Sequence, residues 1–338
     1  MKHFFSFNTI IAGCVLNETI INKNKQVIIN KPGGGLLYAA AGYCIWKKGA
    51  GLIANISENN SIEWTREFEN YHLDTSGIKK IPCDFEQRRF YSITNSNTVL
   101  TDNPQKRFFE IKHPLPKSLL GYEPPQTNID NRNTPVPYSI QPDDIPKDYL
   151  QTNNLLLCPI DYYSHSLIPP FYRSQTNGNV ILCASNGYMH PSFWFDIPSL
   201  IRGSSAFLAT EKQIRNLFKG KSEDIWEMVQ YIAQGGVEIV IIVSATGVHY
   251  LYNAVTSKKY EIPSYPSKVI DTVGTFETFC GGFGAGFTTL FDPLRAGLMG
   301  SVSVSFNVEG STPLHTLQSL PDLVNARLES LMNTVIVI

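Results

Sequence analysis

Charged side chains are scarce in this sequence, and neither sign dominates. Lys and Arg together number 28 and Asp and Glu 29, so charged residues make up 17% of the 338-residue chain, against about 25% in ordinary soluble domains. The net charge of −1 and the lack of any Lys/Arg run exclude the basic surface on which nucleic-acid binding depends. The uncharged stretches fall short of the roughly 18 apolar residues that a membrane span requires. We therefore expect neither a nucleic-acid partner nor a membrane partner.

Cysteines are few and widely spaced. None belongs to a C-x-x-C pair or lies beside a pair of histidines; they are Cys14, Cys44, Cys83, Cys158, Cys183 and Cys280. A zinc site or a disulfide framework is therefore possible but poorly supported, and we expect most of these cysteines to be buried free thiols. These free thiols make a reducing, cytoplasmic location the default. The apolar run at 9–16 lacks the small-residue cleavage site of a signal peptide, which favours a strand.

Apolar and aromatic residues are plentiful, at 43% and 12% of the chain, and can fill a large core. Short apolar runs predict strands at 9–16, 52–56, 155–160, 180–183, 206–208 and 237–243. Helical patterns lie between several of them. The clearest spans 222–234, with Ser222 as the expected N-cap and Gly235 at its end. This alternation predicts a single α/β domain over 1–338, with a mainly parallel sheet covered on both faces.

Three segments depart from that alternation. Residues 17–31 contain two β-prone runs around a polar turn, and residues 86–112 show a similar hairpin-like pattern. We expect both to form a small β lid. Residues 121–147 are rich in Pro, Asn and Asp, which predicts a long surface connection.

A first helix start follows three consecutive glycines. Pro32 and Gly33–Gly35 precede an apolar run at 36–46 that predicts a buried helix. Glycines at this point allow a ligand to approach free backbone N–H groups at the positive end of the helix. The alternative is a tight turn into a core helix, without any ligand.

A second helix start lies near the C-terminus, where Gly274 precedes a helix with Glu277 in its first turn. A carboxylate at this position can offset the helix dipole, an effect worth about 0.3–1 kcal/mol. It can also act as a general base beside backbone amides that stabilise a developing anion. The segment by itself does not decide between the two.

Taken in this order, the two segments resemble the signatures of the PfkB/ribokinase family of sugar and nucleoside kinases. The late family pattern is D-T-x-G-A-G-D-x-F-x-x-G-F, and the matching residues here are Asp271, Thr272, Gly274, Phe279, Gly282 and Phe283. The resemblance implies a ribokinase-like three-layer α/β sandwich with a mainly parallel sheet and a small β lid. It also implies ATP-dependent phosphorylation of a small alcohol, a sugar or a nucleoside, with ATP and Mg²⁺ as cofactors.

The resemblance assigns roles to particular positions. Glu277 would be the catalytic base, and Gly274, Thr275 and Phe276 would form the anion hole. The residues matching acceptor-binding positions are Asn17, Glu18, Gly34, Gly35 and Tyr38. Those matching nucleotide-binding positions are Thr210, Gln213, Ser244 and Gly247. No metal-ligating residue is implied, and lid sheets of this family suggest a homodimer formed through the lid.

Several of these positions depart from the family pattern. Glu277 is one methylene longer than the expected Asp, and Phe276 stands in place of a glycine. If that position requires a conformation open mainly to glycine, Phe276 costs about 1–2 kcal/mol. Thr210 and Gln213 remove the family's carboxylate, unless a shift of one residue restores it as Glu211. These departures predict weak nucleotide binding and leave a pseudokinase, which keeps only a binding or assembly role, as the alternative to a kinase.

Overall fold

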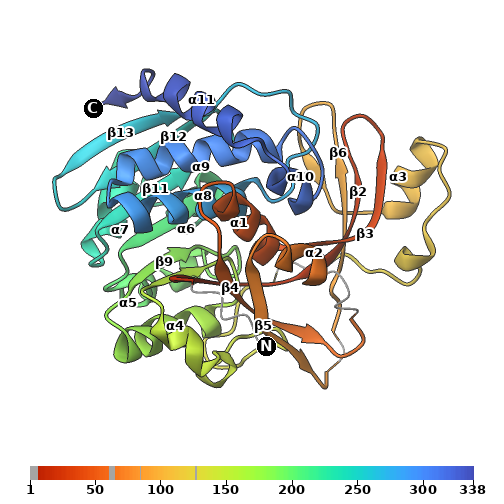
Figure 1. The fold of residues 1–338 in the computed structure, drawn as a ribbon, viewed down its shortest axis with the longest axis horizontal. Coiled ribbons are helices and arrows are strands. Elements are labelled where there is room, and N and C mark those ends of the chain that lie inside the picture. The colour runs from red at the N-terminus through yellow and green to blue at the C-terminus, as the bar shows by residue number, and fades with distance from the viewer. Residues whose placement is uncertain (1–6, 61–64, 84, 126–127) are drawn as a thin grey trace.

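The computed structural model describes residues 7–60, 65–83, 85–125 and 128–338. Its centre is a large sheet with the strand order β14-β13-β12-β11-β10-β9-β8-β1-β4-β5 (Figure 1). These strands are β1 (Thr9–Ala12), β4 (Ala50–Ser57), β5 (Leu73–Ile81), β8 (Asn154–Leu157), β9 (Asn179–Cys183), β10 (Ala206–Thr210), β11 (Ile239–Val243), β12 (Val248–Asn253), β13 (Lys258–Pro263) and β14 (Ile336–Val337). Neighbouring strands from β5 to β11 are parallel, and β12 to β14 continue the sheet in antiparallel fashion.

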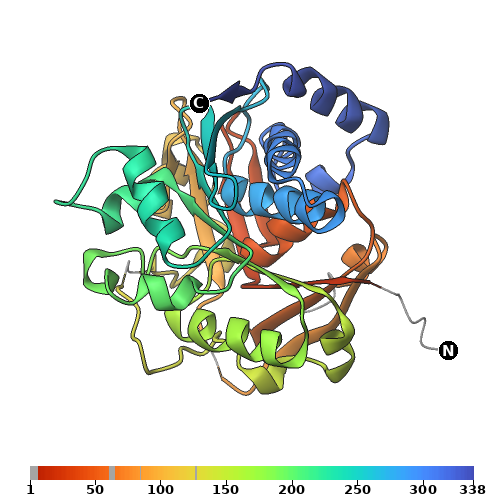
Figure 2. The ribbon, with the colours of Figure 1, turned by 90° about the vertical axis from the view of Figure 1, so that its left-hand side faces the viewer.

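Helices cover both faces of this sheet, which makes a three-layer sandwich (Figure 2). One face carries α1 (Gly35–Cys44), α8 (Thr275–Leu290), α9 (Pro293–Asn307) and α11 (Pro321–Met332), with α10 (Pro313–Leu317) beside α1 and α9. The other carries α4 (Tyr162–Gln175), α5 (Ile197–Ile201), α6 (Glu211–Leu217) and α7 (Ile225–Gln234). The short α2 (Thr65–Glu69) contacts β5.

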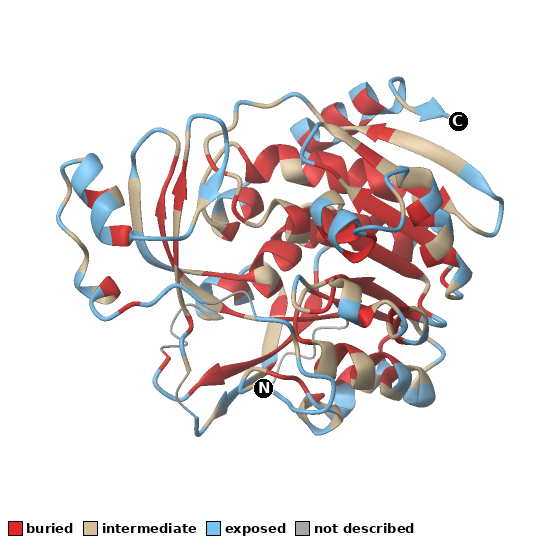
Figure 3. Cartoon of the chain, turned by 180° about the vertical axis from the view of Figure 1, so that it is seen from behind, coloured by how far each residue is buried: buried red, intermediate tan, exposed pale blue. Residues whose placement is uncertain are grey.

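The apolar core alternates along the strands as a sheet buried on both faces requires. Leu156 of β8 packs under the α1/α8 layer, whereas Leu155 and Leu157 pack under α4. Buried residues are concentrated in the sheet and in the helix faces turned toward it (Figure 3). No helix in the described part of the chain is long and apolar enough to cross a membrane.

A second, smaller sheet projects from one side of the sandwich (Figure 1). It consists of β2 (Leu16–Ile21), β3 (Val27–Gly33), β6 (Arg88–Ile93) and β7 (Val99–Leu100), in the order β3-β2-β6-β7. The β2–β3 hairpin occupies the range expected for the first lid segment. The second lid segment is only partly strand, because α3 (Pro104–Glu110) follows β7. Asn103 causes this departure: its side chain accepts a hydrogen bond from the N–H of Lys106, and Pro104 suits the first helical position.

Three further expectations are corrected by the structure. The run at 9–16 is divided between sheets, since β1 ends at Ala12 and β2 begins at Leu16. The N-cap of α7 is Asp224, not Ser222, because the Asp224 carboxylate accepts hydrogen bonds from two N–H groups of the first turn. The 121–147 connection is not confined to the surface, since Ile140 is fully buried.

Four short 3₁₀ helices lie in the connections: η1 (Lys117–Leu119), η2 (Pro142–Asp144), η3 (Lys147–Gln151) and η4 (Pro191–Phe193).

The six cysteines are free thiols. Fewer of them are buried than expected: Cys158, Cys183 and Cys280 are buried, Cys14 and Cys44 are partly buried, and Cys83 is exposed.

Glycines set the distance between α1 and α8. A Cβ atom at Gly42 would overlap the carbonyl oxygen of Thr278, and one at Gly281 would overlap that of Ala39. The backbones of the two helices are therefore in direct contact where Ala39–Gly42 of α1 meets Thr278–Gly281 of α8. This contact places the N-terminus of α1 beside that of α8, although the two are about 240 residues apart in sequence.

Candidate active site

A pocket of about 250 Å³ lies at the carboxyl ends of the parallel strands, between the sandwich and the lid. Both helix N-termini open onto it: Gly34 and Gly35 at α1, and Gly274 and Glu277 at α8. Ligands of open α/β sheets bind at this edge. The volume is near the lower end of the range for ligand pockets, which suits a small molecule.

Glu18, from lid strand β2, is held against the start of α1. Its Oε1 accepts a hydrogen bond from the Gly34 N–H at 2.8 Å, and its Oε2 accepts one from the Tyr38 hydroxyl at 2.9 Å. A Cβ atom at Gly33 would overlap this carboxylate, so a glycine is required there. The Gly34 N–H is thus already used by the protein and is not free for a ligand.

Burial raises the pKa of Glu18 to about 8, although the hydrogen bonds from Gly34 and Tyr38 oppose the shift. The nearby charges of Asp271 and Glu277 add to the rise. At neutral pH, Glu18 is therefore mostly an uncharged acid. Such a group can exchange hydrogen bonds with an alcohol without repelling the other carboxylates of the pocket.

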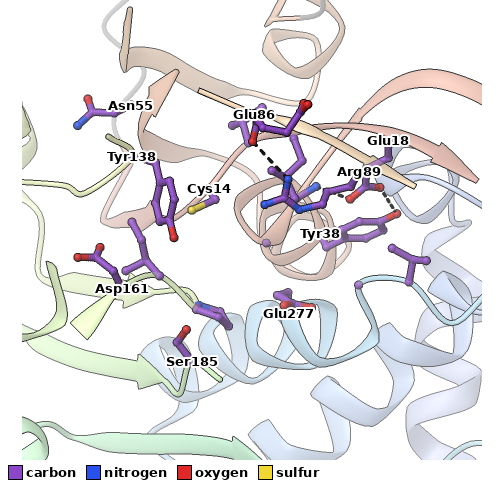
Figure 4. Close-up of a pocket in the computed structure, with 18 of the residues that line it drawn as sticks. Cys14, Glu18, Tyr38, Asn55, Glu86, Arg89, Tyr138, Asp161, Ser185 and Glu277 are labelled. Atoms are coloured by element: carbon purple, nitrogen blue, oxygen red, sulfur yellow. Dashed lines mark hydrogen bonds between the residues drawn. The ribbon is translucent and has the colours of Figure 1, made fainter. Parts of the chain in front are cut away.

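Glu277 lies in the first turn of α8, on the wall opposite the lid (Figure 4). Its side chain rests on Gly35, where an added Cβ atom would lie 3.3 Å from the Glu277 Cγ. Among the described residues, its carboxylate receives a hydrogen bond only from its own backbone N–H. Burial raises the pKa of Glu277. The structure therefore presents an available carboxylate at the positive end of a helix.

The turn before α8 matches the expected anion hole in part. Gly274 is left-handed, with φ of 72°, and caps the helix, so the backbone N–H groups of the first turn, including those of Thr275 and Phe276, are not used within the helix. Phe276 is helical rather than left-handed, so the strain expected at this position does not arise. Its ring belongs to the same core cluster as Phe279 and does not line the pocket. The pocket is therefore open at 274–277.

Four of the five residues expected to bind the acceptor lie together in the pocket. Glu18, Gly34, Gly35 and Tyr38 all line the pocket. Asn17 does not: it precedes Glu18 in β2, lines a neighbouring depression and donates from its side-chain amide to Asn60. Alternation along a strand explains the difference, because successive side chains point to opposite faces.

The nucleotide positions lie on the same sheet edge but outside this pocket. Thr210 and Gln213 form a capping box at the start of α6, in which each side chain bonds the other residue's backbone N–H. Ser244, which follows β11, donates a short hydrogen bond to Glu211, and the Glu211 carboxylate also pairs with Arg215. Glu211, the carboxylate at the start of α6, is thus engaged by Ser244 and Arg215.

Gly247 is the fourth of these positions. It is left-handed, with φ of 95°, and no atom lies within 4 Å of where its Cβ would be. The side of its backbone where a Cβ would stand is therefore open to an approaching group, as expected of a glycine in a ligand-binding turn, while its carbonyl accepts a hydrogen bond from the Ser264 N–H.

Sequence reasoning missed several residues that line the pocket. Asp161 and Ser185 follow β8 and β9, so the strand-end rule could have found them. Asp161 is already bonded to the hydroxyls of Ser139 and Ser164 and caps α4. Arg89, in β6, lies on the face of the lid strand that lines the pocket. Which strand residues lie on that face is known only once the strand register is known.

The 121–147 connection also contributes to the pocket, through Asp130 and Tyr138. Asp130 accepts a hydrogen bond from the Tyr162 N–H, and burial raises its pKa to about 6. No local sequence pattern marks either residue, because the connection is placed by its packing on the rest of the fold.

No protein-family model and no curated protein matches this chain. Solved structures do match it. The ribokinase of Thermotoga maritima is 16% identical over 95% of this chain and 99% of its own, with a TM-score of 0.64. A fructokinase of Xylella fastidiosa with bound ATP is 12% identical over 96% and 98%, with a TM-score of 0.66. A nucleoside kinase of Burkholderia thailandensis in complex with inosine is 13% identical over 95% and 96%, with a TM-score of 0.65.

At these identities the likeness establishes the architecture. The expected fold class is confirmed: the chain has the ribokinase-like α/β fold, which it shares with this ribokinase, fructokinase and nucleoside kinase.

Proposed function

We propose that this protein is a PfkB-type kinase that transfers a phosphoryl group from ATP to a hydroxyl of a small molecule held in the pocket. The observation that carries the proposal is the placement of Glu277. Its carboxylate stands at the N-terminus of α8, without a partner from another described residue, and faces the same pocket as Gly34, Gly35 and Glu18. The departures from the family pattern have not closed this pocket.

In this proposal, Glu277 accepts the proton of the attacking hydroxyl. It acts from within the first turn of α8, where the free backbone N–H groups stabilise negative charge that develops on the transferred group. Glu18 and Tyr38 orient the acceptor from the side of α1. The raised pKa of Glu277 brings it closer to the operating pH, which suits a general base.

The residues present fit a phosphoryl group, since α8 offers a 16-residue helix whose N-terminus opens onto the pocket. ATP would supply that group when bound. Mg²⁺ in nucleotide sites is held mainly by phosphate oxygens and water, with one or two carboxylates, and the carboxylate on the nucleotide side, Glu211, is bonded to Ser244 and Arg215. We therefore assign no step to a protein-bound metal.

The second candidate function is a pseudokinase that binds the acceptor without turnover. It is favoured by the contacts on the nucleotide side, where Thr210 and Gln213 satisfy each other and Gln213 also donates to the Ala184 carbonyl. These polar groups are used within the protein. The fructokinase solved with bound ATP and the nucleoside kinase solved with inosine support the kinase, because they share the fold.

The deciding experiment is turnover of ATP with a panel of sugars, sugar derivatives and nucleosides. Glu277→Gln should lower the rate by about 10²–10⁴-fold, because it removes the proton acceptor but keeps the size of the side chain. Glu223→Gln is the matched control, since its side chain is 96% exposed and does not line the pocket. Acceptor binding without turnover in the wild type would support the pseudokinase. Turnover unaffected by Glu277→Gln would show that the site is elsewhere.

A further inference from the structure

Arg89 is the only cationic side chain among the described residues that line the pocket. It comes from lid strand β6 and lies above the pocket, between Cys14 on one side and Glu18 on the other (Figure 4). Its charge lowers the pKa values of Cys14, Tyr91 and Tyr138, all of which line the pocket and all of which are raised overall by burial. Arg89 therefore acts on the interior of the pocket and not only on its rim.

The guanidinium of the neighbouring Arg88, on the same strand, has hydrogen-bond partners. Its Nε donates to both carboxylate oxygens of Glu86, at 2.8 and 3.1 Å, and its Nη1 donates to the carbonyls of Ser118 and Leu120. Arg88 lines the neighbouring depression, on the other face of the strand. The Glu86 carboxylate is therefore already hydrogen-bonded to Arg88.

Arg89 has no such partner. Its Nη1 donates to the backbone carbonyls of Arg88 at 2.8 Å and Glu86 at 3.3 Å. Within the described part of the chain, no carboxylate forms an ion pair with it, and its Nε and Nη2 have no hydrogen-bond acceptor. A guanidinium has five N–H donors in a fixed fork, so several of those of Arg89, a residue that lines the pocket, have no acceptor among the described residues. The charge of Arg89 also helps to lower the pKa of Glu86, but the Glu86 carboxylate is hydrogen-bonded to Arg88 and not to Arg89.

Among the described residues, the other carboxylates of the pocket form no ion pair with Arg89. Asp130 accepts a hydrogen bond from the Tyr162 N–H. Glu18 is bonded to Gly34 and Tyr38 and, with a pKa of about 8, is mostly neutral. Asp161 is bonded to two serine hydroxyls. Glu277 stands on the opposite wall, at the start of α8 (Figure 4).

We propose that Arg89 binds an anionic group of the acceptor, a carboxylate or a phosphate, while the hydroxyl to be phosphorylated points to Glu277. This inference rests on the proposed function and narrows its substrate class from alcohols in general to hydroxy acids or sugar phosphates. Carboxylates and phosphates share the geometry that a guanidinium fork recognises with two parallel hydrogen bonds. The anion lies on the lid side, so the lid carries the specificity of the site.

The test is calorimetric binding without nucleotide, using matched pairs: glucose with gluconate, and ribose with ribose 5-phosphate. We expect at least one anionic member to bind the wild type at least tenfold more tightly than its neutral partner. Arg89→Gln should remove that preference, and Arg89→Lys should restore only part of it, because lysine keeps the charge but not the fork. The pair that shows the preference identifies a carboxylate or a phosphate.

Lys31→Gln is the control for charge. Lys31 lies on β3 of the same lid sheet, is exposed and does not line the pocket, so the same loss of one positive charge should leave binding unchanged. Thermal unfolding verifies that each variant is folded. Equal binding of neutral and anionic members, no binding of either anion, or binding of the anion unchanged by Arg89→Gln would overturn the inference.

A parallel turnover assay separates this inference from the proposed function. An anion that binds through Arg89 but is never phosphorylated would uphold the inference and refute the kinase. Phosphorylation of neutral sugars at a rate independent of Arg89 would support the kinase and refute the inference.

Discussion

The ring of Tyr38 lies directly against the backbone of Gly274, so closely that a Cβ atom on Gly274 would overlap the ring. Tyr38 belongs to the first turn of α1, and Gly274 caps α8. This contact joins the two glycine-bearing helix starts. The hydroxyl of the same tyrosine holds Glu18, so one side chain connects the lid, the acceptor side and the anion-hole side of the pocket.

Gly274→Ala should therefore damage both stability and activity. The left-handed φ of 72° costs an alanine about 1–2 kcal/mol, and the overlap with Tyr38 adds about 1–3 kcal/mol. Gly220→Ala is the matched control: its φ is 76°, but no atom lies within 4 Å of its would-be Cβ. Urea unfolding should show the larger loss for Gly274→Ala. Equal losses in the two variants would mean that the tyrosine moves aside freely.

Gly281→Ala tests the contact between α1 and α8. The added Cβ would overlap the Ala39 carbonyl oxygen and push the helices apart, at a cost of about 1–3 kcal/mol. Gly284→Ala, one turn further along α8, meets its nearest neighbour at 3.4 Å, an ordinary contact. That control should be neutral or stabilising by up to about 1 kcal/mol, because alanine favours helices. Acceptor binding should weaken only in Gly281→Ala, and a stable Gly281→Ala variant would contradict the role of the glycine.

The six predicted strands of the main sheet, the first hairpin of the lid and both helix starts could be read from the sequence, because apolar period and glycine placement are local signals. The conformation of Phe276 was not readable in this way. The family pattern places a glycine there, whereas the chain continues the helix and buries the ring in the core. Asn17 and Glu18 could be separated only by strand register, which decides which of the two faces the pocket.

Glu18→Gln should change the pH dependence of stability. Burial raises the folded-state pKa of Glu18 to about 8, above the roughly 4.3 of an unfolded glutamate. The folded protein therefore keeps a proton that the unfolded chain releases, so this stabilisation is complete below pH ~4 and is lost as the pH rises toward 8, by at most about 1.4 kcal/mol per pH unit.

Glutamine is neutral at every pH and keeps an acceptor for the Gly34 N–H. Between about pH 5 and pH 8, unfolding free energies should thus diverge in favour of Glu18→Gln as the pH rises. Glu223→Gln, at a side chain that is 96% exposed, is the control for removal of one carboxylate. Parallel pH profiles for the wild type and Glu18→Gln would show that Glu18 ionises normally in the folded protein.

The last prediction concerns Phe276 and Glu277, neighbours in the first turn of α8 whose side chains have opposite tasks. Phe276 is 8% exposed and belongs to the core, so Phe276→Ala should lower the free energy of unfolding by about 3 kcal/mol or more. Because its ring does not line the pocket, acceptor binding should persist in that variant at temperatures where it remains folded.

Glu277→Gln should show the reverse pattern. No other described residue depends on its carboxylate for a hydrogen bond, so stability should change by less than about 1 kcal/mol, a normal value for a substitution that breaks no contact. Turnover should nevertheless fall by about 10²-fold or more, because the proton acceptor is gone. Urea unfolding, calorimetric acceptor binding and turnover, measured on both variants, separate the two roles. Loss of acceptor binding in folded Phe276→Ala would show that the Phe276 ring belongs to the pocket. Full turnover in Glu277→Gln would show that the catalytic base does not lie on α8.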